Sequence, residues 1–554
     1  MKNQQSQLHL CLAVGLALAG RPQLSLAQPT AEEAVRFLEQ STFGPNPALI
    51  QHVQDIGFDA FLEEQFNMAP TGWTDYGLCP GDPGAMNNPC NPTGCTTCTR
   101  NSYTMYRVQN EFYRRALTAT DQLRLRVVFA LDQIWVISAQ VVDNFQTGWM
   151  AYYLNNAIEP NVFGNYRDLM GAITLSPGMG RYLDMAGNNG AAPNENYARE
   201  ILQLFCVGLD ELNDDGTPIL DEFQNRIPSY NQDIIVGFAK VFTGWNFAPN
   251  VIDPPNCAQT PTNLQCPNWR DQMVLTESRH NHESKTLMID IRSPDPVVLP
   301  ANQMGPDDLA QGLDNIFYNH NVPPFIVKQL IQKLVTSNPS QDYVTRVVQV
   351  FQDNGSGVRG DFRAVIKAIL LDQEARNPPG QNFGKLREPV LAITTLLRSF
   401  NTDDPFTDFV LGESFLPSNL RLDEDLFRSP TVFNFYSPFF PLDGGLVGPE
   451  FAIQGTANTL GRINLMNALV YIGIPPDSNR PLGTRIPQAE MAAYAQNGPD
   501  NLVSSLNTLM LHGAMSDDLR TAVLNAVSGI PDPTQMAQYA VYLIATSSSY
   551  QVQR

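Results

Sequence analysis

The sequence predicts a mainly α-helical protein, built as a single large multi-helical body with long loops. Apolar residues recur at three- and four-residue spacing in many segments, and signals for β-strands are sparse. The stretches between these segments are rich in Pro, Gly and Asn, and they carry aromatic residues or cysteines of their own. We find no internal repeat and no flexible tether, so one body is favoured over separate domains.

Several segments have both helical periodicity and a residue suited to begin a helix. Thr30 precedes the first of them, Ser340 and Asp361 are placed to cap two others, and Pro389 suits the first turn of another. The predicted helices span residues 32–40, 121–135, 325–335, 343–351, 362–371, 389–397, 516–527 and 535–546.

A small β-hairpin is predicted near residues 211–230. Asp215-Gly216 is a strong turn signal, and Ile219-Leu220 would lie on the returning strand. The same stretch also fits a calcium-binding loop, with Glu211 at its first position and Glu222 at its twelfth. The hairpin is favoured because short patterns often match by chance and because Glu replaces the usual Asp at the first position.

Residues 1–27 are predicted to be a signal peptide. A weakly positive start is followed by an apolar run from Leu8 to Ala19, and Ser25-Leu26-Ala27 fits cleavage before Gln28. The alternative is a buried N-terminal helix. No later stretch is long and apolar enough to span a membrane. We therefore expect a secreted or periplasmic protein whose residues 28–554 form one helical domain.

The charge of the chain excludes some classes of partner. The formal net charge is -20, and loss of residues 1–27, which carry Lys2 and Arg21 but no acidic residue, makes it -22. Such a charge repels nucleic acids and anionic membranes. Apolar residues make up 43% of the chain, enough for a folded core.

Six cysteines lie in two irregular loops, near residues 79–98 and 257–266. In an oxidising compartment they are expected to form disulfides that staple these loops. Zinc binding is the alternative for the first loop, because Cys95-Thr-Thr-Cys98 has the spacing of metal ligands. Cys206, among apolar neighbours, is predicted to be a buried free thiol.

The segment Asn194–Gly208 is predicted to be one helix with a polar opening. Asn194 would cap it, and Glu195 suits the positive end of its dipole. One face carries Asn196, Arg199, Glu200 and Gln203. A solvated helix face explains this pattern. Alternatively, it is a site in which Glu200 is a general acid or base and Arg199 binds an anion.

Other polar residues could extend such a site. Asp184 would supply a second catalytic carboxylate beside Glu200, and Arg181, Glu195, Asn196, Arg199 and Lys285 are candidates for substrate binding. His280 and His282 are separated by one residue, so in an extended backbone both rings point to the same side and could face one divalent metal ion. His280 is also a candidate catalytic residue, although a polar loop with two surface histidines would give the same pattern.

Two further segments mix polar and apolar residues. Lys385-Leu-Arg-Glu-Pro389 opens an apolar helix, and we expect Arg387 and Glu388 to form a buried pair with each other. Residues 433–440 form an aromatic segment that is predicted to be core, with a lid or a carbohydrate-stacking surface as the alternative. Motifs of serine hydrolases, zinc proteases and nucleotide-binding proteins are absent, so no nucleotide or flavin is expected.

Many of these segments together resemble the bacterial family called domain of unknown function 1800. The resemblance includes the segments Phe43–Pro45, Gly164–Asp168, Ser176–Met179, Asn194–Gly208, Phe242–Trp245, Lys285–Leu287, Lys385–Pro389, Ser429–Tyr436 and Tyr550–Arg554. Arg279–Glu283 departs from the His-Asp-x-Gly run expected there, which weakens the role given to His280. The resemblance implies a large exported helical protein, whose genes often neighbour those of an alkaline-phosphatase-like family. It supplies no catalytic residues.

Two classes of function follow. The first is an uncharacterised exported factor that binds or helps to mature another exported protein, such as the phosphatase-like neighbour. The second is an extracytoplasmic hydrolase, with or without a metal ion, that acts on a polymer through Glu200, Asp184 and His280.

Overall fold

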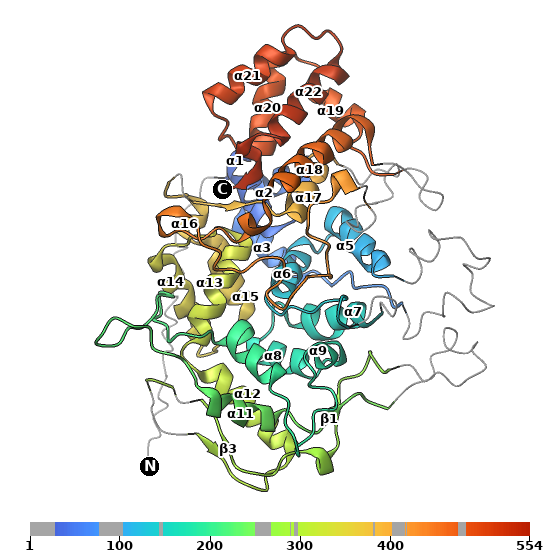
Figure 1. Cartoon of the computed structure of the whole chain (residues 1–554). Helices are drawn as coiled ribbons and strands as arrows, with labels where there is room; N and C mark the ends of the chain where they lie inside the picture. Colours follow the sequence, from blue (N-terminus) through green and yellow to red (C-terminus); the bar gives the residue numbers. More distant parts are fainter. Residues whose placement is uncertain are drawn as a thin grey trace, which may run out of the picture.

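The computed structural model describes residues 28–76, 104–142, 148–249, 267–288, 290–292, 297–380, 383–401, 416, 418–474 and 483–554. Within these ranges the chain is predominantly α-helical, as the sequence predicts. Figure 1 shows the helices stacked along one elongated body, with α19, α20, α21 and α22 at one end and α11, α12 and β3 at the other.

The helices of the first half are mostly short. They are α1 (Ala31–Ser41), α2 (Pro47–Ile56), α3 (Phe58–Asn67), α5 (Tyr106–Thr118), α6 (Gln122–Asp132), α7 (Gly148–Tyr152), α8 (Tyr166–Thr174), α9 (Pro177–Tyr182), α10 (Asn196–Glu200) and α11 (Gln232–Val241). The π-helix η1 (Tyr153–Ile158) continues α7, and the π-helix η3 (Ile201–Cys206) continues α10.

Most helices of the second half are longer, although α16 and α23 have only four residues each. They are α12 (Gly305–Tyr318), α13 (Val322–Leu334), α14 (Gln341–Gln352), α15 (Phe362–Leu371), α16 (Gln373–Arg376), α17 (Pro389–Ser399), α18 (Thr456–Asn467), α19 (Gln488–Tyr494), α20 (Pro499–Leu511), α21 (Asp517–Val527), α22 (Pro533–Ala545) and α23 (Ser548–Gln551). A third π-helix, η9 (Ala468–Ile472), continues α18.

The predicted helix starts are confirmed where a side chain caps them. Thr30 and Glu33 form a reciprocal capping box at α1, with N–O distances of 2.8 and 3.2 Å. Ser340 accepts a hydrogen bond from the Tyr343 amide at α14, and Asp361 accepts one from the Ala364 amide at α15. Each cap satisfies an amide that has no partner inside its helix.

One continuous hydrophobic core connects the two ends of the described chain, from Ala34 on α1 to Tyr550 on α23. Helix α1 contacts α20 of the C-terminal helical group as well as α2 beside it in sequence. The first and last helices are thus held together by the same core (Figure 1).

The strands are short and antiparallel. They pair as β1 (Trp245–Asn246) with β2 (Val274–Leu275), β3 (Lys285–Thr286) with β4 (Val298–Leu299), and β5 (Lys385–Leu386) with β6 (Val552–Gln553). The third pair places the C-terminal residues beside the start of the segment Lys385–Pro389. Two segments that carry the family resemblance are therefore neighbours in space.

The expected hairpin near residues 211–230 forms isolated β-bridges rather than regular strands. The bridges pair Leu212 with Pro218 and Leu220 with Arg226, and Gly216 turns the chain with a φ of 75°. The side chain of Glu211 is buried and lies 3.0 Å from the Nε2 atom of His320. Glu211, the residue at the first position of the alternative calcium loop, therefore already contacts His320.

Residues 1–27 and the two cysteine-rich loops lie outside the described residues, so the signal peptide and the disulfides remain predictions. Cys206 is described and is a buried free cysteine, as expected. None of the described helices is long and apolar enough to cross a membrane.

Candidate functional site

The segment Asn194–Gly208 is not the single α-helix predicted from the sequence. Asn194 lies before the helix and accepts a hydrogen bond of 2.8 Å from the Asn196 amide. Helix α10 ends at Glu200, and residues 201–206 continue as the π-helix η3. A π-helix widens the turn and shifts the faces that a period of 3.6 residues predicts. Such wide turns are frequent at functional sites.

Glu200 lies at the junction between the two helical forms and is half-buried. Its Oε2 atom is buried and has no hydrogen-bond partner among the described residues. Burial raises the pKa of this carboxyl, and the neighbouring Arg199 opposes the shift. Burial together with the Glu200 carboxylate raises the pKa of Tyr182 to about 12 and also raises that of Tyr230.

The other polar residues of this region form exposed pairs. Arg199 lies 2.5 Å from Glu195 and donates to Gln232 at 2.8 Å. Asn196 donates to the Asp184 carboxylate at 2.9 Å, and Asp184 has a positive φ of 57°. A left-handed backbone at a residue other than glycine stores strain, which is typical of functional sites. Arg181 is exposed on α9.

His280 does not join this group. Its side chain has no exposed surface, and its two ring nitrogens lie 2.9 Å from the Thr243 carbonyl oxygen and 2.8 Å from Asp308. Within the described ranges, no hydrogen bond or ion pair connects Glu200 with Asp184 or His280. The structure therefore brings Asp184 to Asn196 and leaves His280 in a separate buried cluster.

Lys285 also belongs to that buried cluster rather than to a substrate surface. Its ammonium group is fully buried and lies 2.5 Å from Asp308, the same carboxylate that contacts His280. Asp308 is not among the candidates from the sequence, because an acidic residue in the first turn of a helix such as α12 is common and carries no special signal.

The residues around His280 and His282 do not fit a bound metal ion. The two rings are 5.5 Å apart, but both nitrogens of His280 already have partners. Nδ1 of His282 lies 3.2 Å from the Gln303 carbonyl oxygen. No group of three or more His, Cys, Asp or Glu residues in the described part of the chain is arranged to hold a metal ion.

A second polar region surrounds Glu388 at the start of α17. Arg387 and Glu388 are both buried, but the expected pair between them is wrong. Arg387 lies 2.5 Å from Glu39 of α1. Glu388 instead accepts hydrogen bonds from Gln133 and Tyr436 and lies 3.6 Å from Lys385. Adjacent residues on an extended backbone point apart, so each finds a distant partner.

This buried cluster borders a small cavity of about 10 Å³ between α6 and the segment 424–435. Its polar lining consists of Asp132, Gln133, Glu424, Ser429 and Asn434. Burial raises the pKa of Asp132 to about 8, and the Oγ atom of Ser429 has no partner among the described residues. The cavity has room for one water molecule, which could bridge these groups.

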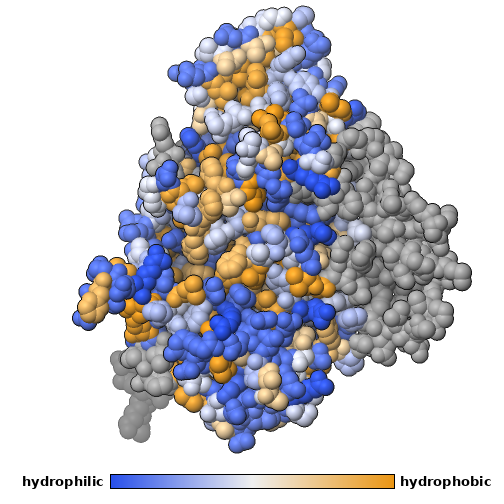
Figure 2. All heavy atoms as spheres, viewed as in Figure 1, coloured by the Kyte–Doolittle hydropathy of each residue, from blue (hydrophilic) through white to orange (hydrophobic). Residues whose placement is uncertain are grey.

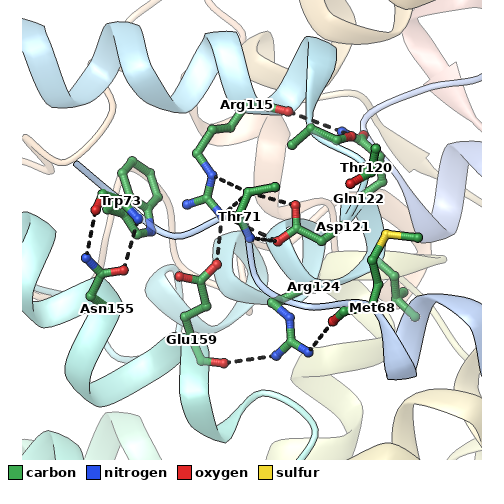
Figure 3. Close-up of polar contacts among 12 residues, drawn as sticks. Met68, Thr71, Trp73, Arg115, Thr120, Asp121, Gln122, Arg124, Asn155 and Glu159 are labelled. Atoms are coloured by element: carbon green, nitrogen blue, oxygen red, sulfur yellow. Dashed lines mark hydrogen bonds and ion pairs between the residues drawn. The ribbon is translucent and has the colours of Figure 1, made fainter.

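A third polar network, drawn in Figure 3, is centred on Arg115 of α5. Arg115 lies 2.7 Å from Glu159 and 3.5 Å from Asp121, and it donates to the Thr71 hydroxyl. Arg124 donates to the Glu159 carbonyl oxygen at 3.3 Å. These groups neutralise one another, so we assign this network to stability rather than to chemistry.

Comparison with known proteins identifies the family. No curated protein and no solved structure matches the chain. A family model described as "Protein of unknown function (DUF1800)" matches residues 36–552. The match includes the Glu200 region, the buried cluster around Glu388 and the C-terminal helical group. The chain therefore belongs to the DUF1800 family of proteins of unknown function.

Proposed function

We propose that the protein is an exported factor that binds, or helps to mature, another exported protein through an exposed aromatic surface. We use the name aromatic surface for three exposed phenylalanines between residues 433 and 451, namely Phe433, Phe439 and Phe451, whose exposed fractions are 47%, 52% and 41%. Exposed aromatic residues are enriched where proteins bind one another, because they bury large areas on association. These three phenylalanines, on one segment of the chain, are the observation that carries the proposal.

The segment that carries the aromatic surface is anchored to the body. Asn338 exchanges two hydrogen bonds with the backbone of Val447, at 2.8 and 2.9 Å. Tyr436 is buried and donates its hydroxyl hydrogen to Glu388. A surface that is held in place before binding loses less conformational entropy when a partner docks. Apolar residues also form a patch across the middle of the face shown in Figure 2, above a mainly hydrophilic lower part.

Capture of exported proteins by the mature chain tests this role. We expect the wild-type chain to retain a specific exported protein, and the phosphatase-like protein implied by the resemblance is the first to look for. The triple variant Phe433→Ser, Phe439→Ser, Phe451→Ser is expected to lose it, because the buried area of the interface would shrink.

Phe223→Ser is the matched control for this experiment. Phe223 is 75% exposed but lies in the bridged loop between Asp221 and Asn225, away from the aromatic surface in sequence. This variant should retain the partner. Recovery of no specific protein by the wild-type chain, or equal recovery by the triple variant, contradicts the proposal.

The environment of Glu200 supports a second candidate function, a hydrolase without a metal ion at this position. A half-buried carboxyl with a raised pKa keeps a proton at higher pH than a solvated one, which suits a general acid. Arg181 is exposed on α9, and Arg199 precedes Glu200 on α10, where it pairs with Glu195. The guanidinium groups of Arg181 and Arg199 could bind an anionic part of a polymer. His280 is not part of this candidate, because its nitrogens are occupied.

Glu200→Gln separates a catalytic role from a structural one. The pKa of the Glu200 carboxyl is higher in the folded chain than in the unfolded chain. Its contribution to stability is therefore fully present below the unfolded-state pKa and is lost as the pH rises through the folded-state pKa. The variant should keep the free energy of unfolding at pH 7.5 within about 1 kcal/mol of wild type. It should also abolish release of fragments from a polymer substrate. Loss of stability by a larger amount, or unchanged fragment release, contradicts this second candidate.

A further inference from the structure

An open groove lies between α2 and the helices α19 and α20, far in sequence from the aromatic surface. Its volume is about 370 Å³, within the range of small-molecule sites. It is lined by Pro47, Ile50, Gln51, Gln54, Tyr494, Ser504, Ser505, Thr508 and Leu509. Helix α20 also contacts α1, so the two walls belong to one packed core.

The chemistry of the lining is neutral. No charged side chain is among the lining residues, although the chain carries a formal net charge of -20. The polar groups are amides and hydroxyls, which both donate and accept hydrogen bonds. An ionic ligand would lose its hydration in such a groove without gaining an opposite charge. A neutral ligand with several hydroxyl groups would find a partner for each of them.

Several of these groups are free to bind. The hydroxyls of Ser504 and Ser505 have no hydrogen-bond partner within the described ranges. Gln51 and Gln54 use their amide nitrogens on Asp55 and on the Pro29 carbonyl oxygen, at 2.8 and 3.3 Å. These bonds fix both side chains and leave the amide oxygens as acceptors.

Tyr494 supplies the aromatic element of the groove. Its ring packs edge-on against Phe400, with ring centres 6.0 Å apart and an interplanar angle of 88°. Its hydroxyl is a neutral hydrogen-bond donor at physiological pH, and burial together with the nearby Glu490 raises its pKa further. An aromatic ring with a polar tip can pack against the apolar face of a sugar ring and hydrogen-bond to its edge.

The two walls of the groove, α2 and α20, both contact helix α1. Thr508 of α20 donates a hydrogen bond of 2.8 Å to Glu32 of α1, which lowers the pKa of that carboxyl. The groove is therefore formed before any ligand arrives, and little ordering is needed on binding.

We propose that this groove binds a neutral saccharide of one or two units. The binding site is separate from the aromatic surface, so the two proposals can fail independently. Amide and hydroxyl groups from α2 and α20 would bind the sugar hydroxyls, and Tyr494 would pack against the ring.

Calorimetric titration of the full mature chain tests the proposal. The probes are cellobiose, maltose and N,N′-diacetylchitobiose, with digalacturonate as a charged dimer of similar size. We expect saturable binding of at least one neutral disaccharide and none of digalacturonate. Ser505→Phe should fill the groove and weaken binding at least about tenfold.

Two further variants keep the test decisive. Ser504→Ala combined with Ser505→Ala removes two hydroxyls without adding bulk, and it should weaken binding about threefold or more while the chain remains folded. Thr521→Phe, on an exposed position of α21, adds the same bulk outside the groove and should leave binding unchanged. No binding of any neutral disaccharide at about 10 mM, equal binding of digalacturonate, or unaltered binding by both groove variants would overturn the proposal.

Discussion

Arg115→Ala is expected to lower the free energy of unfolding by about 3–5 kcal/mol. The substitution removes the cation that forms ion pairs with the carboxylates of Glu159 and Asp121, whose side chains are only 4% and 0% exposed (Figure 3). An uncompensated buried charge costs far more than the net value of the pair that it came from. Urea unfolding followed by tryptophan fluorescence measures the change.

Arg114→Ala is a matched control on the same helix. The side chain of Arg114 is 52% exposed and lies 3.6 Å from Glu111. Its loss should cost less than about 1 kcal/mol, because water screens an exposed pair. Equal effects of the two substitutions would contradict the structural role that we assign to the Arg115 network.

Glu388→Gln is the second substitution with a large expected effect, again about 3–5 kcal/mol at pH 7. Burial alone would raise the pKa of Glu388, but Lys385, Lys333 and Arg126 outweigh it and hold the pKa at about 2. The variant removes one of the two buried carboxylates described beside Lys385 and leaves only Glu450, which lies 3.2 Å from the Lys385 ammonium group. Urea unfolding at several pH values measures the loss.

The pH dependence of this effect has a defined sign. The folded-state pKa of Glu388 lies below the unfolded value of 4.5, so its stabilisation is present above about pH 4.5 and is lost as the pH falls towards 2. The difference between wild type and Glu388→Gln should therefore shrink as the pH falls below 4.5. Glu63→Gln is the control for Glu388→Gln. Glu63 forms a half-exposed ion pair with Lys367, so this substitution should lower the free energy of unfolding by less than about 1 kcal/mol. If the difference in unfolding free energy between wild type and Glu388→Gln does not change with pH, the lowered pKa of Glu388 is contradicted.

The sequence predicts the helices well where local signals decide them. Caps such as Thr30, Ser340 and Asp361 satisfy amides within three residues, so neighbouring residues contain the necessary information. The π-helix after Glu200 was missed because the apolar pattern of Ile201–Cys206 is compatible with an ordinary helix. Residues 201–206 pack against α12 and α13, which are distant in sequence and are not visible in the local pattern.

The partners of the polar residues could not be predicted in the same way. His280 and Asp308 are 28 positions apart, and Arg387 and Glu39 are 348 apart. No local sequence pattern predicts such pairs, because a buried basic residue can pair with any buried acidic residue that the fold places beside it. Asp132 carried a weak signal, because it ends an apolar run from Val127 to Leu131 that is buried throughout. The exposed fraction of Phe433 and Phe439 likewise depends on how the segment is anchored.

The dissociation constant of the wild-type chain for the exported protein that it captures tests the central claim most directly. We expect the aromatic triple variant, Phe433→Ser, Phe439→Ser, Phe451→Ser, to raise this Kd about 100-fold. Phe223→Ser should leave it unchanged. A Kd for the triple variant equal to that of the wild-type chain would contradict a binding role for the aromatic surface.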